Sequence, residues 1–155
     1  MVPIRNSVKA IIIQNDQLLV IKKEDHEGVY YILPGGGQEH LETFHQTLKR
    51  ECIEEIGREV EIGDVLLIRE YIGKNHEHAE FDANTHQIEY MFLCTLQGNH
   101  TKIQNGINPD DGQIGVEWLP IRELLTYRLY PQHMRQYLIE YHEGNSIPTY
   151  LGDVN

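Results

Sequence analysis

Residues 34–58 of this chain read PGGGQEHLETFHQTLKRECIEEIGR, and this stretch decides how the fold is interpreted. Thr43 is a favourable N-cap, and Gln46 three residues later completes a capping-box pattern. Apolar residues then recur every four positions and predict one buried stripe on a helix. They are Leu48, Cys52 and Ile56. Gly57 is a natural stop, so we predict a helix between Thr43 and Gly57.

Three glutamates share one side of this predicted helix. Glu51, Glu54 and Glu55 are spaced i, i+3 and i+4, so at about 100° per residue they fall within an arc of about 100°. Such like charges repel each other, and the helix dipole disfavours anions near the C-terminus. A solvated helix face is one explanation. A bound divalent cation is the other, because Mg²⁺ prefers carboxylate and water oxygens.

A glycine-rich bend comes before the helix, in residues 34–37. Glycines allow a sharp turn and a close approach of the backbone to a metal or phosphate. Arg50 directly precedes Glu51, where its planar guanidinium could orient a carboxylate or a phosphate.

The whole pattern resembles the Nudix box: Gly, five residues, Glu, seven residues, then Arg-Glu-apolar-any-Glu-Glu-any-Gly-apolar. The fixed positions are all matched, by Gly36, Glu42, Arg50, Glu51, Glu54, Glu55 and Gly57. Seven positions at fixed spacing make a specific signal, although the box covers only 23 of 155 residues. Three positions depart from the pattern. Cys52 replaces the usual Leu, Arg58 replaces an apolar residue, and Leu41 replaces a Gly common before the first Glu.

The resemblance implies an α/β (α+β) fold, a Nudix-type α/β/α sandwich with a central mixed sheet and a loop-helix-loop catalytic motif. We expect one Nudix hydrolase domain over residues 1–155. The resemblance also implies that Glu51, Glu54 and Glu55 bind Mg²⁺ or Mn²⁺, helped by a carbonyl of Gly35 or Gly36. Glu51 is alternatively the base that activates water. Arg50 and Glu42 would brace the site, and water would attack phosphorus within a pyrophosphate.

In many relatives a further carboxylate outside the box acts as base or metal ligand. We expect it in the loop before the strand that carries Trp118. Asp111 is the first candidate there, ahead of Asp110 and Glu117. Weaker candidates elsewhere are Glu89, Glu77 and Glu80.

The rest of the chain predicts further strands and helices around the box. Asn15-Asp16 forms a hairpin turn between two β-rich runs. The predicted strands are residues 7–13, 17–23, 29–33, 86–96 and 116–119. Residues 59–72 hold one or two strands, with Gly63-Asp64 as a possible turn. We expect loops at 73–85 and 98–115, and helices at 121–127 and 131–142. No repeat or linker indicates a domain boundary.

Composition limits the partners. The formal net charge of −11 disfavours long nucleic acids and anionic membranes, but a bound cation still permits a small phosphorylated substrate. No apolar run approaches the roughly 20 residues of a membrane span, and no leader pattern is seen, so we expect a cytoplasmic protein. Cys52 and Cys94 have no metal-binding spacing and are interpreted as reduced core residues.

Aromatic and histidine residues leave alternatives open. Tyr71 and Phe81 flank the predicted polar loop and are candidates for stacking on a nucleobase. Tyr90 and Phe92 alternate with Ile88 and are interpreted as core, and residues 127–131 as packing against the last helix. The remaining histidines could suggest zinc, but their spacing favours a surface loop. These are His76, His78 and His86.

We therefore expect a metal-dependent pyrophosphohydrolase that cleaves a nucleoside diphosphate linked to another group, with ADP-ribose or a nucleotide sugar favoured. Segments 69–72, 86–90 and 118–120 are similar to small bacterial ADP-ribose pyrophosphatases. The alternative is a MutT-like (deoxy)nucleoside triphosphate pyrophosphatase. A non-catalytic nucleotide sensor is the alternative of another class, and the acidic charge disfavours messenger-RNA decapping. A homodimer is compatible with the resemblance.

Overall fold

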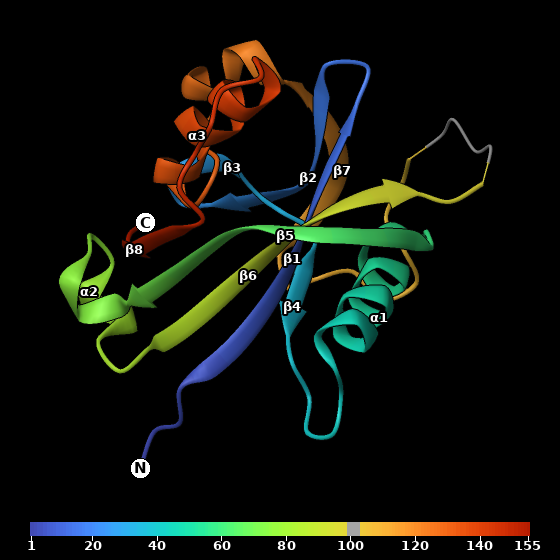
Figure 1. Cartoon of the computed structure of the whole chain (residues 1–155). Helices are drawn as coiled ribbons and strands as arrows, with labels where there is room; N and C mark the ends of the chain where they lie inside the picture. The colour runs from blue at the N-terminus through green and yellow to red at the C-terminus, as the bar shows by residue number, and fades with distance from the viewer. Residues whose placement is uncertain (99–102) are drawn as a thin grey trace.

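The computed structural model describes residues 1–98 and 103–155, which form a mixed β-sheet with helices on its faces (Figure 1). The strands are β1 (Arg5–Gln14), β2 (Gln17–Asp25), β3 (Gly28–Ile32), β4 (Gly35–Gly37), β5 (Val60–Ile72), β6 (His86–Leu96), β7 (Gln113–Pro120) and β8 (Tyr150–Asp153). Their order is β3-β2-β1-β6-β5-β8, and β4 and β7 join by pairing with β1 and β2. This is the α+β arrangement that the sequence predicts.

Strand β1 connects the two parts of the sheet. It runs parallel to β6 and antiparallel to β4, and its last residues pair with β2 through Ile13–Leu18 and Gln14–Gln17. Strands β3 and β7 extend the sheet beyond β2. The sheet therefore divides around β1, and β4 brings the glycine-rich bend to this division.

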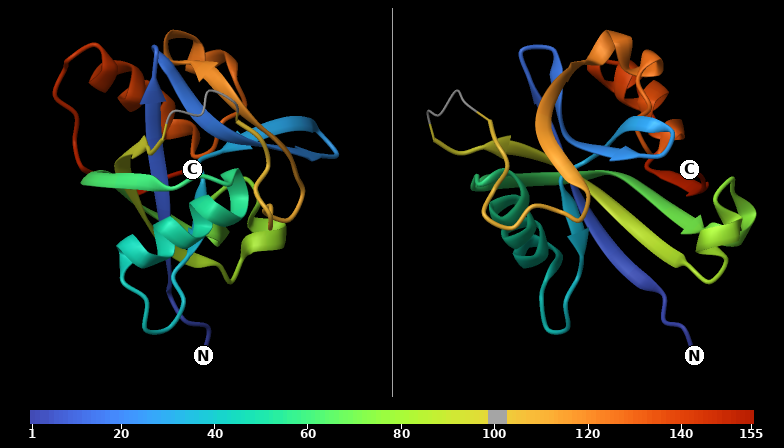
Figure 2. Two further views of the ribbon diagram at one scale, coloured as in Figure 1. Left: turned by 90° about the vertical axis from the view of Figure 1, so that its right-hand side faces the viewer. Right: turned by 180° about the vertical axis from the view of Figure 1, so that it is seen from behind.

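The two longer helices lie on opposite sides of the sheet, α1 (Phe44–Ile56) on one and α3 (Gln132–His142) on the other (Figures 1 and 2). The shorter ones are η1 (Gly73–Asn75), α2 (Ala79–Asp82) and η2 (Ile121–Thr126), where η marks a 3₁₀ helix. No helix in the described ranges is both long and apolar enough to cross a membrane.

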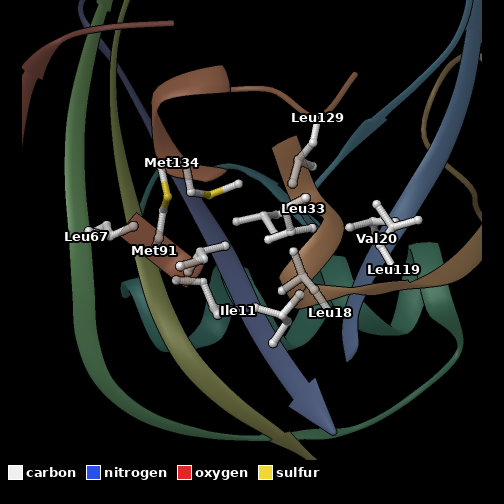
Figure 3. Close-up of a cluster of buried hydrophobic side chains, with 12 residues drawn as sticks. Ile11, Leu18, Val20, Leu33, Leu67, Met91, Leu119, Leu129 and Met134 are labelled. Atoms are coloured by element: carbon white, nitrogen blue, oxygen red, sulfur yellow. The ribbon is translucent and has the colours of Figure 1, made fainter. Parts of the chain in front are cut away.

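Each side of the sheet has its own hydrophobic core. On the α3 side, buried residues from the strands meet Met134 and Leu138 of the helix, and Figure 3 shows this cluster around Ile11, Leu33 and Met91. On the α1 side, Val8, Ala10 and Ile12 of β1 pack with the helix residues Leu48, Cys52 and Ile56. The predicted buried stripe of the box helix is therefore confirmed, and Cys52 and Cys94 are free, buried thiols.

Local signals in the sequence account for the hairpin and for α1. Asn15 and Asp16 have φ of 50° and 61°, which these residues tolerate better than most. Gln46 N–H donates to the Thr43 hydroxyl at 3.1 Å, and the Gln46 side chain accepts from Thr43 N–H at 2.8 Å. Gly57 ends the helix with φ of 65°. The predicted capping box and glycine stop are confirmed.

Three predicted segments differ from the structure. Gly63-Asp64 does not form a turn, because residues 60–72 form one strand whose register against β6 shifts between Ile62 and Val65. Residues 73–85 are not all loop, since they include η1 and α2. The helix predicted at 121–127 is the 3₁₀ helix η2, which ends at Thr126. Phe92 packs against the core on the α1 side, and Tyr90, also half-buried, contacts the ring of Phe44.

Two strands have no counterpart in the sequence predictions. β4 consists of three glycines, and β8 adds to the sheet edge by running parallel to β5. Within the predicted loop 98–115, residues 99–102 lie outside the described part of the chain, and β7 already begins at Gln113.

Candidate active site

The glycine-rich bend and the end of α1 are joined by a buried hydrogen bond. Gly35 N–H donates to Oε1 of Glu55 at 2.7 Å, while Oε2 of Glu55 is buried without a hydrogen-bond partner in the described structure. Burial raises the pKa of Glu55 to about 7, and the nearby Lys9 opposes this rise. A buried carboxylate oxygen with no partner is costly unless a cation or proton satisfies it.

Glu51 lies directly over Gly36. A Cβ at Gly36 would be 2.6 Å from Oε1 of Glu51, so only glycine leaves room for this carboxylate beside the backbone. Burial raises the pKa of Glu51, and the guanidinium of Arg50 opposes the rise. A glycine backbone and two carboxylates therefore meet at one place.

Arg50 organises the acidic groups around it. Its Nε and Nη2 donate to the two carboxylate oxygens of Glu42 at 2.8 and 2.9 Å, and Nη2 also donates to the Gly37 carbonyl at 3.2 Å. Nη1 reaches Glu51 at 3.1 Å and Glu54 at 3.4 Å. The bond from Arg50 lowers the pKa of Glu42 to about 2. Arg50 thus links the bend, Glu42 and the metal-ligand candidates.

The three helix glutamates do not form a ready-made cage. Within residues 1–98 and 103–155, no three Asp, Glu, His or Cys side chains are gathered closely enough to hold a metal ion. Glu51 and Glu55 lie against the glycine backbone, whereas Glu54 turns toward Arg50. The residues fit a divalent ion through the unpartnered Glu55 oxygen, the adjacent Glu51 and a hard-oxygen donor set.

Lys9 is a polar contributor that the sequence analysis missed. It belongs to β1, where it pairs with Gly35, and its Nζ donates to the carbonyls of Gly35 at 3.1 Å and Leu33 at 3.4 Å. A lysine within the apolar run of residues 8–13 was the available signal. The pairing that places it beside the box becomes visible only once β4 is known.

Among the candidate carboxylates outside the box, Asp110 is held by Lys23 of β2. Its Oδ2 accepts from Lys23 Nζ at 2.9 Å, and its charge adds a small contribution to the raised pKa of Glu55, after burial and the charge of Glu51. Asp111, the first candidate from sequence, is exposed. Glu117 lies on β7, where it pairs with Lys22 at 3.0 Å and accepts from Tyr31.

A buried ion pair lies in the sheet near Lys9. Arg69 Nε donates to Glu89 at 3.1 Å, and Gln87 supplies a second bond to Glu89 at 3.0 Å. Arg69 and Glu89, with Lys9, Ile32 and Tyr130, line a small cavity. Glu89 therefore has a structural partner, and polar groups face a space next to the box.

The other predicted contact residues lie in segment 73–85 and at Tyr71, near the end of β5. Tyr71 stacks on His76 and donates to Asp82 at 2.8 Å, so its ring already has a partner. Phe81 is 78% exposed and remains open for stacking. Glu77 accepts a hydrogen bond from the side-chain amide of Asn155. Glu80 is exposed and directly precedes Phe81.

The three histidines of this region differ in their contacts. His76 is 2.6 Å from Asp153, and His78 meets the edge of the Tyr130 ring. His86 Nε2 is buried without a hydrogen-bond partner among the described residues.

In the run 127–131, Arg128 lies over Tyr30 and Tyr130. It also pairs with Asp25 at 2.8 Å, so this run packs against β2 and β3 as well as joining α3.

The mixed sheet, with a glycine bend hydrogen-bonded to an acidic helix, is the fold of the Nudix class of proteins. The family model for the NUDIX domain matches residues 3–140, and the chain belongs to the Nudix hydrolase family. No curated protein matches the sequence.

Solved structures of similar fold include other Nudix proteins. A NUDIX hydrolase from Nitrosomonas europaea has 20% identity and a TM-score of 0.71, with 94% of this chain and 93% of that one covered. An ADP-ribose pyrophosphatase from Streptococcus suis has 20% identity and a TM-score of 0.66, covering 97% and 100%. A MutT NUDIX hydrolase from Burkholderia pseudomallei has 20% identity and a TM-score of 0.68, covering 88% and 98%. At these identities the likeness shows the fold.

Proposed function

We propose that this protein is a Mg²⁺- or Mn²⁺-dependent pyrophosphohydrolase that cleaves a nucleoside diphosphate linked to another group. The observation that carries the proposal is the contact between the bend and the helix. Glu55 is bonded to Gly35, and Glu51 lies over Gly36. Two carboxylates thus lie against the glycine bend, and a hard cation would bind between them and a carbonyl of the bend.

In this proposal Glu51, Glu54 and Glu55 hold the ion, with a carbonyl of Gly35 or Gly36. Glu54 would leave its 3.4 Å contact with Arg50 to do so. The bound ion would neutralise the developing charge on the phosphates and lower the pKa of the attacking water. Arg50 and Glu42 keep the other carboxylates oriented, and their bidentate pair fixes Arg50.

The proton acceptor in this proposal is one of three carboxylates. As the alternative to its role as a metal ligand, Glu51 is the acceptor that the box itself offers, because burial raises its pKa and favours proton uptake. Asp110 and Asp111 remain candidates from the loop before β7. The charge of Asp110 contributes to the raised pKa of Glu55, which links Asp110 to the site.

We favour ADP-ribose or a nucleotide sugar as substrate. The fold is shared with a protein described as an ADP-ribose pyrophosphatase. Segment 73–85 also presents the exposed Phe81, which a nucleobase could cover. A MutT-like triphosphate pyrophosphatase is the second candidate, because a protein described as MutT has the same fold. The bound molecule is small in either case.

A substrate panel with Mg²⁺ and Mn²⁺, with products identified by mass, tests the proposal. AMP and ribose phosphate from ADP-ribose support the first candidate, and pyrophosphate from a triphosphate supports the second. Glu54→Gln protein, purified identically, controls for contaminating hydrolases. Saturable nucleotide binding without turnover at any metal concentration would instead indicate a non-catalytic sensor.

A further inference from the structure

Lys9 brings a positive charge to the edge of the carboxylate site. Its neighbours Val8 and Ala10 are fully buried in the core on the α1 side. Because side chains alternate along a strand, Lys9 points to the other face, where the sheet divides around β1. Its ammonium bonds two backbone carbonyls there, and its charge acts on both Glu55 and Glu51.

We propose that Lys9 is the built-in counter-cation of the metal-free site, and that a divalent ion displaces its ammonium from the Gly35 carbonyl. This inference rests on the proposed function, because it requires Glu51 and Glu55 to be metal ligands. It adds a role for a residue outside the box.

The Gly35 carbonyl is the point of competition. Lys9 Nζ is 3.1 Å from this oxygen, which the Nudix resemblance offers as a metal ligand. Mg²⁺ binds its oxygen ligands at about 2.1 Å, and two cations on one carbonyl would repel each other strongly. Metal binding through Gly35 therefore requires the ammonium to move away.

Lys9 compensates charge without occupying the carboxylates. Its nitrogen bonds are to the carbonyls of Leu33 and Gly35, whereas Oε2 of Glu55 keeps no partner in the described structure. A buried carboxylate pair without a nearby cation would destabilise the metal-free fold. Lys9 therefore lowers this cost and leaves the carboxylate oxygens available to the ion.

A small cavity beside Lys9 would receive the displaced side chain. Lys9 lines the small cavity together with Arg69, Glu89 and Tyr130. Glu89 would offer the ammonium a carboxylate there, and the lysine stem is long and flexible. The ammonium would share Glu89 with Arg69 and Gln87, which already donate to this carboxylate.

The test is the affinity of substrate-free protein for Mn²⁺, measured by electron paramagnetic resonance at pH 8.5. Lys9→Met should bind Mn²⁺ about three- to tenfold more tightly than wild type, because one competing positive charge is gone. The same variant should have a lower melting temperature without metal. A purely structural role for Lys9 would lower the melting temperature without tightening metal binding.

Two variants make the result specific. Lys9→Arg keeps the charge and should return the Mn²⁺ affinity to within about twofold of wild type. Lys49→Met removes an equal charge from an exposed position on α1 and should leave the affinity unchanged. If Lys9→Met does not fold, Lys9→Gln replaces it, since a neutral amide can still donate to the Gly35 carbonyl.

The outcomes separate this inference from the proposed function. Unchanged or weaker Mn²⁺ binding by folded Lys9→Met overturns the role of Lys9 while leaving a working metal site. Absence of Mn²⁺ binding by wild type overturns both the inference and the proposed metal-dependent function. Tighter binding that Lys9→Arg reverses supports the inference.

Discussion

The carboxylate of Glu55 accepts the N–H of Gly35 at 2.7 Å, across 20 residues of sequence, and its second oxygen has no partner in the described structure. This contact fixes the glycine bend against the end of α1. It also leaves a carboxylate, 2% exposed, without full compensation. Burying this unpaired oxygen therefore lowers the stability of the fold, and a bound cation would offset the loss.

Glu55→Gln should stabilise the metal-free protein at alkaline pH and abolish turnover. The pKa of Glu55 is raised from 4.5 to about 7, so its contribution to stability is complete below pH 4.5 and lost as pH rises through 7. Glutamine has no charge to bury, which should add roughly 2 kcal/mol of stability at pH 8.5. Urea unfolding of both proteins at pH 5 and 8.5 measures this. A variant less stable than wild type at pH 8.5 would contradict the account of Glu55.

Glu42→Gln should destabilise the protein at neutral pH by about 1 kcal/mol, because it breaks the bidentate pair with Arg50. The Arg50 bond lowers the pKa of Glu42 from 4.5 to about 2. The stability that Glu42 contributes is therefore present above pH 4.5 and lost as pH falls toward 2. The gap between the two proteins should close over this range in thermal unfolding. Glu39→Gln is the control, since Glu39 is exposed and 3.9 Å from Arg50.

Leu41→Gly should stabilise the protein by about 0.5–1 kcal/mol. Leu41 has φ of 71° and is 89% exposed, in a turn closed by Glu42 N–H on the Glu39 carbonyl at 3.1 Å. Glycine relieves the left-handed backbone strain and loses no packing. Leu41→Ala keeps the Cβ and should stay near wild type in chemical denaturation. Equal effects of the two variants would argue against backbone strain.

Gly36→Ala should reduce kcat by about 100-fold or more while shifting the melting temperature little. Its Cβ would displace the flexible end of Glu51, 2.6 Å away, and leave the core in place. Steady-state kinetics on the substrate found by the panel measure the loss. Gly115→Ala is the control, because its Cβ would meet Lys22 only at 3.9 Å. Full activity of Gly36→Ala would mean that Glu51 can act from another position.

Local signals predicted the elements that depend on local chemistry. Thr43, Gln46 and Gly57 define the ends of α1 by capping bonds, and Asn15-Asp16 supply the backbone of the hairpin turn. Strand β4 was not predictable in this way, because glycines are poor strand formers. Its pairing comes from tertiary context. A Cβ at Gly35 would clash with the Val8 carbonyl, so β1 and β4 approach this closely only at glycine.

The candidate site, too, could be predicted only in part from the sequence. The motif spacing indicated the glutamates, Arg50 and the glycines, but not which carboxylate would be buried. That depends on Glu55 reaching Gly35. Lys9 comes from β1, and strand pairing brings it beside Gly35. Asp110 comes from the loop before β7, where Lys23 of β2 bonds it. Sequence separation hides such neighbours.

The most direct test of the metal site is a crystal structure of wild-type protein soaked in Mn²⁺, with anomalous diffraction locating the ion. We predict an anomalous peak bonded to carboxylate oxygens of Glu51 and Glu55 and to a carbonyl of Gly35 or Gly36. An active protein whose Mn²⁺ lies elsewhere, with those oxygens unbound, would contradict the account.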